Sequence, residues 1–297
     1  MPSQYAPRPT RRVLVTGAQG QLGHVIVRAF ADWDVVAHTR ESLDVADPRA
    51  VRDASAAAAP AVIINCAAFN DVDGAQDRPQ AALAANAFAV RSLARAADAC
   101  GAVLVHYGSD FVFDDSPGLR PYTEEAAPSP RSVYGASKLL GDWFGLEAAR
   151  GYVLRVESVF GTPAGWTGRA GTLAKMVDAL ETGREVRAFV DRIVSPSYAE
   201  DVAAATRHLI ESGAPTGLYH CVNSGQGSWY DVAHQAARLL GVEARITPVR
   251  VGEVSMTARR PRFCALDNGK LAAAGFTMPS WQDALGRWLS ARRPSTA

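Results

Sequence analysis

The chain has 297 residues, of which 48% are hydrophobic and 21% are charged, and its formal net charge is +1 at pH 7. This composition is typical of a soluble globular protein, and the balanced charge indicates neither a nucleic-acid partner nor an anionic membrane surface. No run approaches the roughly 18 apolar residues that a membrane-spanning helix needs. Four widely separated cysteines (Cys66, Cys100, Cys221 and Cys264) form no metal-binding pattern. We therefore expect reduced thiols, a cytoplasmic protein and no metal site.

Strands and helices are expected to alternate along the first half of the chain. Residues 1–11 are expected to form a disordered lead-in that lacks the apolar segment of a signal peptide. The predicted elements that follow are strand 13–16, helix 21–31, strand 34–39, strand 61–67, helix 77–100, strand 102–107, helix 132–150 and strand 151–160. Apolar strands separated by helices indicate a parallel sheet covered on both faces. We therefore predict an α/β, doubly wound fold of the Rossmann type, with an NADP-binding core over residues 12–160.

The second half of the chain has a less regular pattern. Residues 116–131, rich in Pro, Ser and Glu, are predicted to form a surface loop before the predicted helix 132–150. Beyond residue 160 the predicted elements are helix 172–182, strand 185–190, helix 199–212, strand 218–222, helix 231–240 and helix 281–289. Such a segment is expected to form a smaller lobe over the carboxyl edge of the sheet, where open α/β sheets bind ligands. We predict a substrate-binding lobe over residues 161–297, with segments near 185–222 returning to the core.

A glycine-rich turn joins the first predicted strand to the first predicted helix. Residues 16–23 read TGAQGQLG, so the glycines follow the spacing G-x-x-G-x-x-G. Glycine allows a tight turn and close approach of the backbone to a pyrophosphate, which the N–H groups and the positive end of the helix dipole then face. We predict a dinucleotide site here, with contacts from Gly17, Gln19 and Gly20.

The end of the second predicted strand selects between NAD and NADP. An acidic residue at this position would bind the 2′-hydroxyl of NAD and repel a 2′-phosphate. The chain instead reads His38-Thr39-Arg40, and its first carboxylate is Glu41. A guanidinium pairs well with a phosphate, so we predict NADPH as the cofactor and NADH as the alternative. The competing interpretation is that Arg40 is a solvated surface charge.

Tyr134 and Lys138 lie four residues apart on a predicted helix, and therefore on one face. A free phenol has a pKa near 10, and a nearby ammonium lowers that pKa, so that the tyrosine can exchange a proton with a carbonyl oxygen. Lys138 is also expected to hold the ribose of the nicotinamide. Ser109 follows the fourth predicted strand, where its hydroxyl can reach a substrate carbonyl. We predict Ser109, Tyr134 and Lys138 to be the catalytic residues of a carbonyl reductase.

Seven segments together resemble the extended short-chain dehydrogenase/reductases, and among them the dTDP-4-dehydrorhamnose reductase family. They are TGAQGQLG at Thr16, LDVAD at Leu43, INCAAFNDVDGAQ at Ile64, AANAFAV at Ala84, GSDFVFDD at Gly108, PYTEEAAPSPRSVYGASKLLGD at Pro121 and RRPRFCALDNGKL at Arg259. The resemblance runs from about Arg12 to Leu289. It implies that NADPH reduces a nucleotide-linked 4-keto-6-deoxy sugar and that Tyr134 protonates the carbonyl oxygen.

The resemblance also implies contacts for individual residues and a homodimer. The implied cofactor contacts are Gly20, Gln21 and Leu22 in the glycine-rich turn, Asp44 and Val45 beside the adenine, and Cys66, Ala67 and Ala68 after the third strand. The implied substrate contacts are Asn70, Val72, Ser109 and Asp110. No metal is implied.

Three positions depart from the pattern of that family. Phe111 stands where a tyrosine is usual, and residues 155–158 read Arg-Val-Glu-Ser where the family has Arg-Thr-Ser-Trp. Arg192 falls in a segment that usually reads Asp-Gln-x-Gly-Ser-Pro-Thr, and it either contacts a diphosphate or is a surface charge. We count Phe111 and Arg192 among the candidate substrate contacts, and we expect the hexose end of the pocket to be altered.

Two other functions stay open from the sequence. A nucleotide-sugar epimerase or dehydratase on the same scaffold would carry an acidic residue near position 39, and a dehydratase would carry an Asp–Glu pair beside Ser109. The chain reads Ser109-Asp110-Phe111, without the second carboxylate. A non-catalytic, NADP-binding regulatory subunit is the third interpretation, and such a protein would not need a proton donor such as Tyr134.

Overall fold

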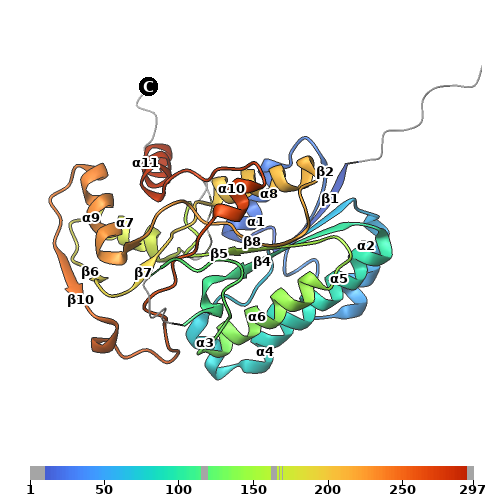
Figure 1. Ribbon diagram of the computed structural model, residues 1–297, viewed down its shortest axis with the longest axis horizontal. Helices are drawn as coiled ribbons and strands as arrows, with labels where there is room; N and C mark the ends of the chain where they lie inside the picture. The colour runs from blue at the N-terminus through green and yellow to red at the C-terminus, as the bar shows by residue number, and fades with distance from the viewer. Residues whose placement is uncertain (1–10, 115–119, 162–165, 167, 169, 293–297) are drawn as a thin grey trace, which may run out of the picture.

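The computed structural model describes residues 11–114, 120–161, 166, 168 and 170–292. Most of the expected disordered lead-in and part of the predicted loop 116–131 lie outside these residues. The centre of the molecule is a parallel six-stranded sheet with the order β2-β1-β3-β4-β5-β8 (Figure 1). Its strands are β1 (Arg12–Thr16), β2 (Asp34–His38), β3 (Val62–Asn65), β4 (Val103–Ser109), β5 (Gly151–Val156) and β8 (Gly217–His220).

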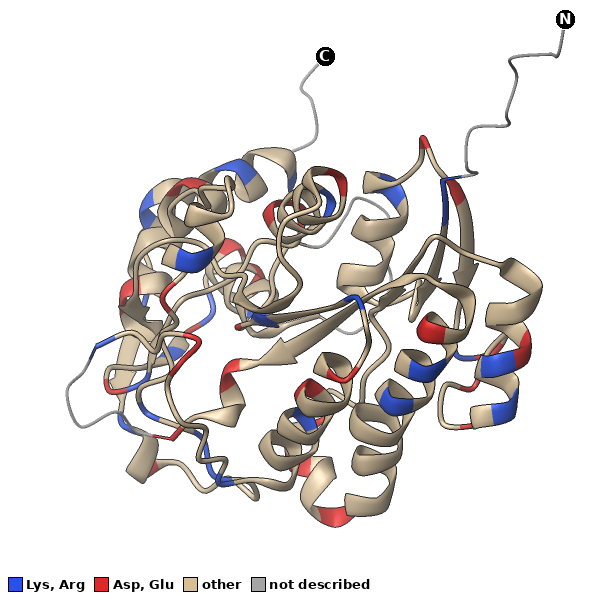
Figure 2. Ribbon diagram, turned by 45° about the vertical axis from the view of Figure 1, so that its right-hand side comes forward, with Lys and Arg blue, Asp and Glu red and all other residues tan. Residues whose placement is uncertain are grey.

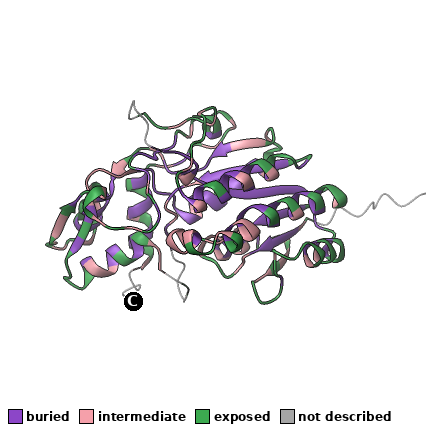
Figure 3. Ribbon diagram, turned by 90° about the horizontal axis from the view of Figure 1, so that it is seen from below, coloured by how far each residue is buried: buried purple, intermediate pink, exposed green. Residues whose placement is uncertain are grey.

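Helices cover both faces of this sheet. The helices are α1 (Gln21–Ala29) and α8 (Ala199–Ser212) on one face, and α2 (Pro48–Ala58), α5 (Ala89–Cys100) and α6 (Val133–Leu146) on the other. Val13 and Val15 of β1 pack in a core with the first pair, whereas Leu14 between them packs with α2 and α5. Strand residues that point to either face of the sheet are therefore apolar. Figure 3 shows the sheet buried between helices with exposed outer sides. The predicted doubly wound α/β fold is confirmed.

The helix predicted over residues 77–100 is wrong as a single element. The chain forms α3 (Val72–Asp77), α4 (Pro79–Leu83), a π-helical turn η1 (Ala84–Phe88) and then α5. Pro79 begins a new helix because its ring removes an N–H and disfavours helical backbone at Arg78. In the π-helical turn, the Asn86 amide accepts from Phe69 N–H at 2.7 Å and donates to Ser137 Oγ at 3.0 Å. This turn thereby ties the helix to the segment after β3 and to α6.

The part of the chain after β5 builds a second apolar core beyond the ends of the strands (Figure 1). Its elements are α7 (Thr172–Glu181), β6 (Val186–Phe189), β7 (Ile193–Val194), β9 (Gly227–Ser228), α9 (Trp229–Leu240), β10 (Ile246–Val249) and α11 (Trp281–Arg292). Strand β10 pairs with β6 in parallel, and β7 pairs with β9 in antiparallel orientation. Two elements of this half return to the large sheet: β8 is one of its strands, and α8 packs against it.

Several short elements carry no prediction from the sequence. They are α2, α3, α10 (Gly269–Ala273), the 3₁₀ turns η2 (Asp110–Val112) and η3 (Val251–Glu253), and strands β7, β9 and β10. Helix α2 has a usable signal, because the Asp47 side chain caps it and Pro48 is its first residue. Basic and acidic residues are interspersed over both parts of the ribbon in Figure 2. Within the described residues, no helix is long and apolar enough to cross a membrane.

Candidate active site

A cavity of about 450 Å³ lies at the carboxyl ends of the central strands, between the sheet and the second core. Thirteen of the predicted site residues line it: Gly20, Gln21, Leu22, Cys66, Ala68, Asn70, Val72, Ser109, Asp110, Phe111, Tyr134, Lys138 and Arg192. The part of the chain after β5 also contributes Gly171, Thr172, Leu173, Trp229 and Arg260 to the lining. The structure therefore brings the predicted catalytic residues, the end of the glycine-rich turn and the predicted substrate contacts into one space.

Six predicted cofactor residues do not line this cavity: Gly17, Gln19, Arg40, Asp44, Val45 and Ala67. Arg40 and Asp44 are exposed beyond the end of β2. Gly17 lies under the turn at a φ of 67°, where a Cβ would come within 2.6 Å of Ala67 N. Gly17 and Ala67 thus shape the turn through their backbones. The adenine end of a dinucleotide would have to extend over Arg40, outside the cavity.

The glycine-rich turn leaves the start of α1 open to an anion. Gly20 is the residue before the helix, and no side chain caps its first turn. Gly20 N–H donates to Gly17 O at 2.9 Å, which closes the turn. Gly23 packs so tightly on this turn that a Cβ would lie 2.2 Å from Gly17 O. The free N–H groups of the first helical turn, at Gln21 and Leu22, therefore face the cavity wall, where a phosphate can accept from them.

Ser109, Tyr134 and Lys138 are buried side by side on β4 and α6. Ser132 caps α6 by accepting from Gly135 N–H at 3.1 Å, which starts the helix just before Tyr134. Lys138 Nζ donates to Tyr107 O at 2.5 Å. Ser109 Oγ accepts from Phe111 N–H at 3.2 Å, and its own proton is donated to Asp110 Oδ1 at 3.0 Å.

The pKa of Tyr134 is raised, which is opposite to the direction expected from the sequence. Burial of the phenol is the main cause, and the interaction with the Ser109 hydroxyl opposes it. Burial also lowers the pKa of Lys138 to about 8, with the Asp142 carboxylate opposing the change. Tyr134 is 8% exposed, so burial disfavours the charged phenolate, and the nearby Asp110 and Asp142 carboxylates disfavour it further. The phenol is consequently protonated at neutral pH, which is the form that donates a proton to a carbonyl.

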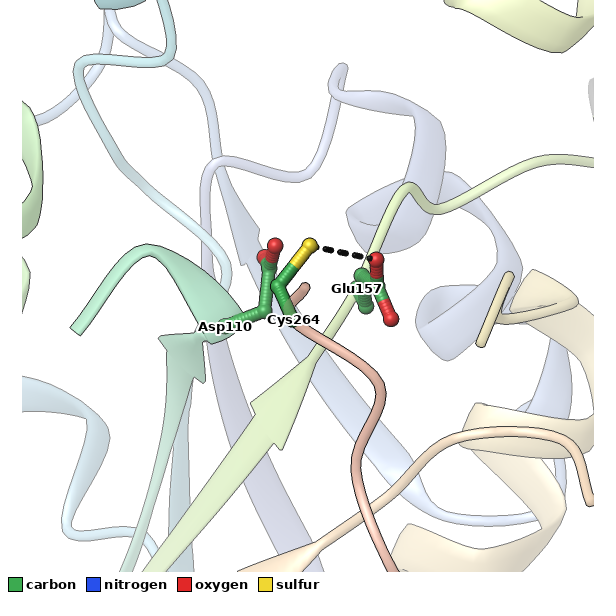
Figure 4. Close-up of side chains that lie close together, drawn as sticks. All are labelled: Asp110, Glu157 and Cys264. Atoms are coloured by element: carbon green, nitrogen blue, oxygen red, sulfur yellow. Dashed lines mark hydrogen bonds between the residues drawn. The ribbon is translucent and has the colours of Figure 1, made fainter. Parts of the chain in front are cut away.

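A second buried carboxylate lies beside Asp110, and inspection of the sequence did not find it. Glu157, which follows β5, is fully buried, and Figure 4 shows its carboxylate facing Cys264 and Asp110. Cys264 Sγ donates to Glu157 Oε1 at 3.2 Å, and Ser195 N–H donates to Glu157 Oε2 at 2.5 Å. The sequential Asp–Glu pair of a dehydratase is absent, and the second carboxylate near Asp110 comes from a different strand. Only the fold brings Glu157 to this place.

Burial raises the pKa of both carboxyl groups. Burial raises the pKa of Asp110 to about 6, and the Arg192 guanidinium opposes the rise. Burial and the nearby Asp110 raise the pKa of Glu157 well above its usual range. The oxygen and sulfur atoms of Asp110, Glu157 and Cys264 lie within 4.8 Å of one another. Donors already occupy both Glu157 oxygens and a guanidinium faces the group, so the arrangement does not suit a cation.

Two arginines flank Phe111 at the cavity wall. The guanidinium carbon of Arg192 lies 5.4 Å from the centre of the Phe111 ring, and that of Arg260 lies 5.9 Å from it. Arg260 pairs with Asp73 at 2.8 Å. Arg192 Nε is buried and has no hydrogen-bond partner among the described residues, so a surface-charge interpretation of Arg192 does not fit. Sequence reasoning missed Arg260, although it lies in one of the segments that carry the resemblance.

The family described as RmlD substrate binding domain matches residues 11–293. The chain belongs to this family. The RmlD-family chain is 36% identical over 290 residues to a dTDP-4-dehydrorhamnose reductase of Streptomyces griseus, a match that covers 94% of this chain and 93% of that protein. It is 33% identical over 282 residues to a dTDP-4-keto-6-deoxy-D-glucose reductase of Streptomyces niveus, with 93% and 96% covered.

A solved structure of the same kind has a very similar fold. It is a dTDP-4-dehydrorhamnose reductase from Bacillus anthracis in complex with NADP. The TM-score is 0.88 at 29% identity, and the match covers 95% of this chain and 99% of that one. The family resemblance stated from the sequence is thus confirmed along nearly the whole RmlD-family chain.

Proposed function

We propose that this protein reduces a nucleotide-linked 4-keto-6-deoxy sugar with NADPH. The observation that carries the proposal is that one cavity holds the open start of α1, Ser109, Tyr134 and Lys138. These are the groups that a carbonyl reductase needs to bind pyrophosphate, hold the carbonyl oxygen, protonate it and orient the nicotinamide ribose. The names of the relatives support the substrate class, and the NADP bound to the solved relative supports the cofactor.

Each residue of the cavity has a distinct task in this proposal. When bound, NADPH supplies the hydride for the carbonyl carbon. The N–H groups at the start of α1 hold the pyrophosphate, and Arg40 pairs with the 2′-phosphate. Ser109 holds the substrate oxygen, an interaction that strengthens as negative charge develops there. The protonated Tyr134 gives its proton to that oxygen, and Lys138 holds the ribose and stabilises the phenolate that remains.

The wall opposite the glycine-rich turn is proposed to take the sugar nucleotide. Asn70, Val72 and Phe111 lie on the sheet side of this wall. Arg192 and Arg260 place two guanidinium groups around Phe111, and a diphosphate is the anion in the substrate that suits them.

Location and assembly are further parts of the proposal. A cytoplasmic location is supported by the four cysteines, all of which are free thiols. A homodimer is supported by an apolar face on η1 and α6, where Phe88, Trp143 and Leu146 are 52%, 57% and 41% exposed.

The function is tested by incubating the purified protein with NADPH and dTDP-4-keto-6-deoxy sugars. The expected result is one NADPH oxidised for each sugar reduced. A changed sugar with no net oxidation of NADPH would establish an epimerase or dehydratase instead. Bound NADP without turnover of any keto-sugar would support a regulatory subunit. Either of these outcomes overturns the proposal.

A further inference from the structure

Arg260 is joined to α3 by a bidentate ion pair. Its Nη2 and Nη1 atoms donate to the two carboxylate oxygens of Asp73, at 2.8 and 3.1 Å. Nη1 also donates to Ala258 O at 2.8 Å, and Asp73 Oδ1 accepts from Ala258 N–H at 2.9 Å. Both side chains line the cavity, and that of Arg260 is only 13% exposed. These four hydrogen bonds give the guanidinium one defined orientation.

The ion pair leaves one edge of the guanidinium free. A guanidinium carries five N–H donors. Asp73 and Ala258 O take three of them, which are the two of Nη1 and one of Nη2. Within the part of the chain that the structure describes, the Nε–H and the second Nη2–H of Arg260 donate to no other group. These two donors lie side by side on one edge of the planar group, and such a fork fits two oxygens of a phosphate.

The helix that carries Asp73 is bonded to the helix that carries the proton donor. Gln76 of α3 accepts from Val133 N–H at 2.7 Å through its Oε1 atom. Val133 is the first residue of α6 and directly precedes Tyr134. The ion pair therefore fixes Arg260 relative to the residue that protonates the substrate.

The segment that carries Arg260 also pairs with the strand next to Arg192. Ile193 N–H donates to Arg262 O at 2.6 Å, and Cys264 N–H donates to Ile193 O at 3.1 Å. Arg192 directly precedes Ile193, so the two arginines of the cavity lining come from paired segments. The bonds to Asp73 connect these segments to the helix beside the large sheet.

We propose that Asp73 is a positioning residue for the sugar nucleotide, which holds Arg260 so that the free edge of the guanidinium binds the diphosphate. The proposal rests on the proposed function and adds a carboxylate to an anion site. Through its charge, Asp73 opposes an anion nearby; through its bonds, it orders a long side chain whose freedom would otherwise be lost on binding. The second effect is the larger, because the Asp73 side chain is 46% exposed and solvent screens its charge.

Calorimetric titration with dTDP, in the presence of excess NADP, tests the proposal without any turnover. Asp73→Asn keeps the size of the side chain but replaces one acceptor oxygen by an NH₂ group. We expect it to raise the dTDP Kd by roughly three- to tenfold, although it removes a negative charge from an anion site. Tighter or unchanged dTDP binding in this variant, or no dTDP binding by the wild type, would overturn the proposal.

Asp71→Asn is the matched control for this titration. Asp71 also lines the cavity, and it caps α3, a task that asparagine performs equally well. The variant removes a negative charge from the same part of the lining without touching Arg260. The dTDP Kd is therefore expected to stay the same or to fall. A rise equal to that of Asp73→Asn would show that the loss does not come from Arg260, and the proposal would fail.

Variants of Arg260 show whether Asp73 acts through it. Arg260→Lys keeps the charge but has no second edge, so the dTDP Kd is expected to rise on the order of tenfold, and wild-type affinity would contradict the proposal. In an Arg260→Gln background, Asp73→Asn is expected to change the dTDP Kd no further. An acidic residue in the first turn also stabilises a helix through its dipole. A role of that kind would weaken dTDP binding equally in both backgrounds, which would overturn the proposal.

Turnover separates this proposal from the proposed function. In Asp73→Asn the KM for the sugar nucleotide is expected to rise by the same factor as the dTDP Kd, with kcat within about twofold of wild type, because the diphosphate is held equally before and during the reaction. If the wild type reduces no keto-sugar, the proposed function fails and the dTDP titrations still decide the role of Asp73. If the wild type is a reductase and Asp73→Asn has an unchanged KM, the proposed function stands and this proposal fails.

Discussion

At the scale of single residues, the state of Tyr134 decides what the cavity can do. Burial raises the pKa of its phenol, so the protein presents a neutral donor at neutral pH. Tyr134→Phe keeps the ring that packs against Phe111, at a centroid distance of 5.3 Å, and removes the hydroxyl group that carries the proton. Turnover is expected to fall by about two orders of magnitude or more, with the NADPH Kd nearly unchanged. Steady-state kinetics and a fluorescence titration measure both, and a variant that keeps half of the wild-type rate would contradict the assignment.

We propose that Arg40 sets the choice of dinucleotide through its charge. It is exposed after β2, and the strand ends without an acidic residue at positions 38–40, so a 2′-phosphate would meet a guanidinium there. Arg40→Ala is expected to erase most of the preference for NADPH over NADH, roughly a tenfold effect that salt weakens because the site is exposed. The ratio of kcat/KM for the two cofactors measures it, and Arg49→Ala, an exposed arginine on α2, is the control. Equal use of both cofactors by the wild type would show that Arg40 does not contribute to the choice of cofactor.

At the scale of helices and strands, the glycine-rich turn works through packing that only glycine permits. A Cβ at Gly23 would lie 2.2 Å from Gly17 O, so Gly23→Ala has to push the turn away from α1. We expect a lower melting temperature and a loss of NADPH affinity, because the N–H groups at the start of the helix move. Gly286→Ala on α11 is the matched control, since nothing lies within 4 Å of its Cβ and alanine favours the helix. Wild-type NADPH affinity in Gly23→Ala would show that the turn tolerates the shift.

The elements that the sequence predicted well are those whose local pattern and packing agree. The six strands of the large sheet and α1, α6, α8 and α9 have apolar residues at the period that the sheet or the second core buries, so their positions could be predicted. The helix over 77–100 could not be divided correctly, because its break depends on Pro79 and on the bonds that Asn86 makes to Phe69 and Ser137. Local pattern does not record such distant partners.

The candidate site shows the same difference between local and distant information. Tyr134 and Lys138 share a helix face, and the glycine-rich turn is one segment, so their spacing together with their place on the predicted strands and helices was enough to predict them. The place of Glu157 depends on how β4, β5 and the segment at Cys264 meet. The sequence shows that Glu157 stands where the family has a smaller residue, but it does not show which way the side chain points. The raised pKa of Tyr134 likewise follows from burial, which the spacing of Tyr134 and Lys138 does not report.

At the scale of the whole molecule, the buried carboxyl group of Glu157 makes stability depend on pH. The folded-state pKa of Glu157 is raised above its unfolded value, so its contribution is fully present below the ordinary glutamate pKa and is lost as pH rises through the folded value. The wild type is therefore expected to lose unfolding free energy relative to Glu157→Gln as pH rises from 5 to 8. Melting curves of both proteins across this range measure the difference, in which the contributions of buried His106 and His220 cancel. Parallel curves would mean that Glu157 does not titrate.

The last property that we predict is the substrate preference of the whole cavity. The prediction rests on the residues at the hexose end. Ser158 lines the cavity at a φ of 44°, where the family has a tryptophan, and Phe111 lacks the usual phenolic hydroxyl. Losing an aromatic wall removes stacking area, and losing a hydroxyl removes a hydrogen bond that rejects the wrong sugar. Glu157, in contrast, is buried behind the wall and changes the sugar site only through Asp110.

We therefore expect a higher kcat/KM with a related dTDP-linked 4-keto-deoxysugar than with dTDP-4-dehydrorhamnose. Steady-state kinetics on a panel of dTDP-linked keto-sugars measures this preference. Phe111→Tyr is expected to shift the ratio towards dTDP-4-dehydrorhamnose, by about one hydrogen bond or up to roughly tenfold, because it returns the hydroxyl without altering the ring. Tryptophan at position 158 is a poorer test, since a bulky side chain is strained at that positive φ. A wild-type preference for dTDP-4-dehydrorhamnose over every neighbouring sugar would show that Ser158 and Phe111 leave specificity unchanged.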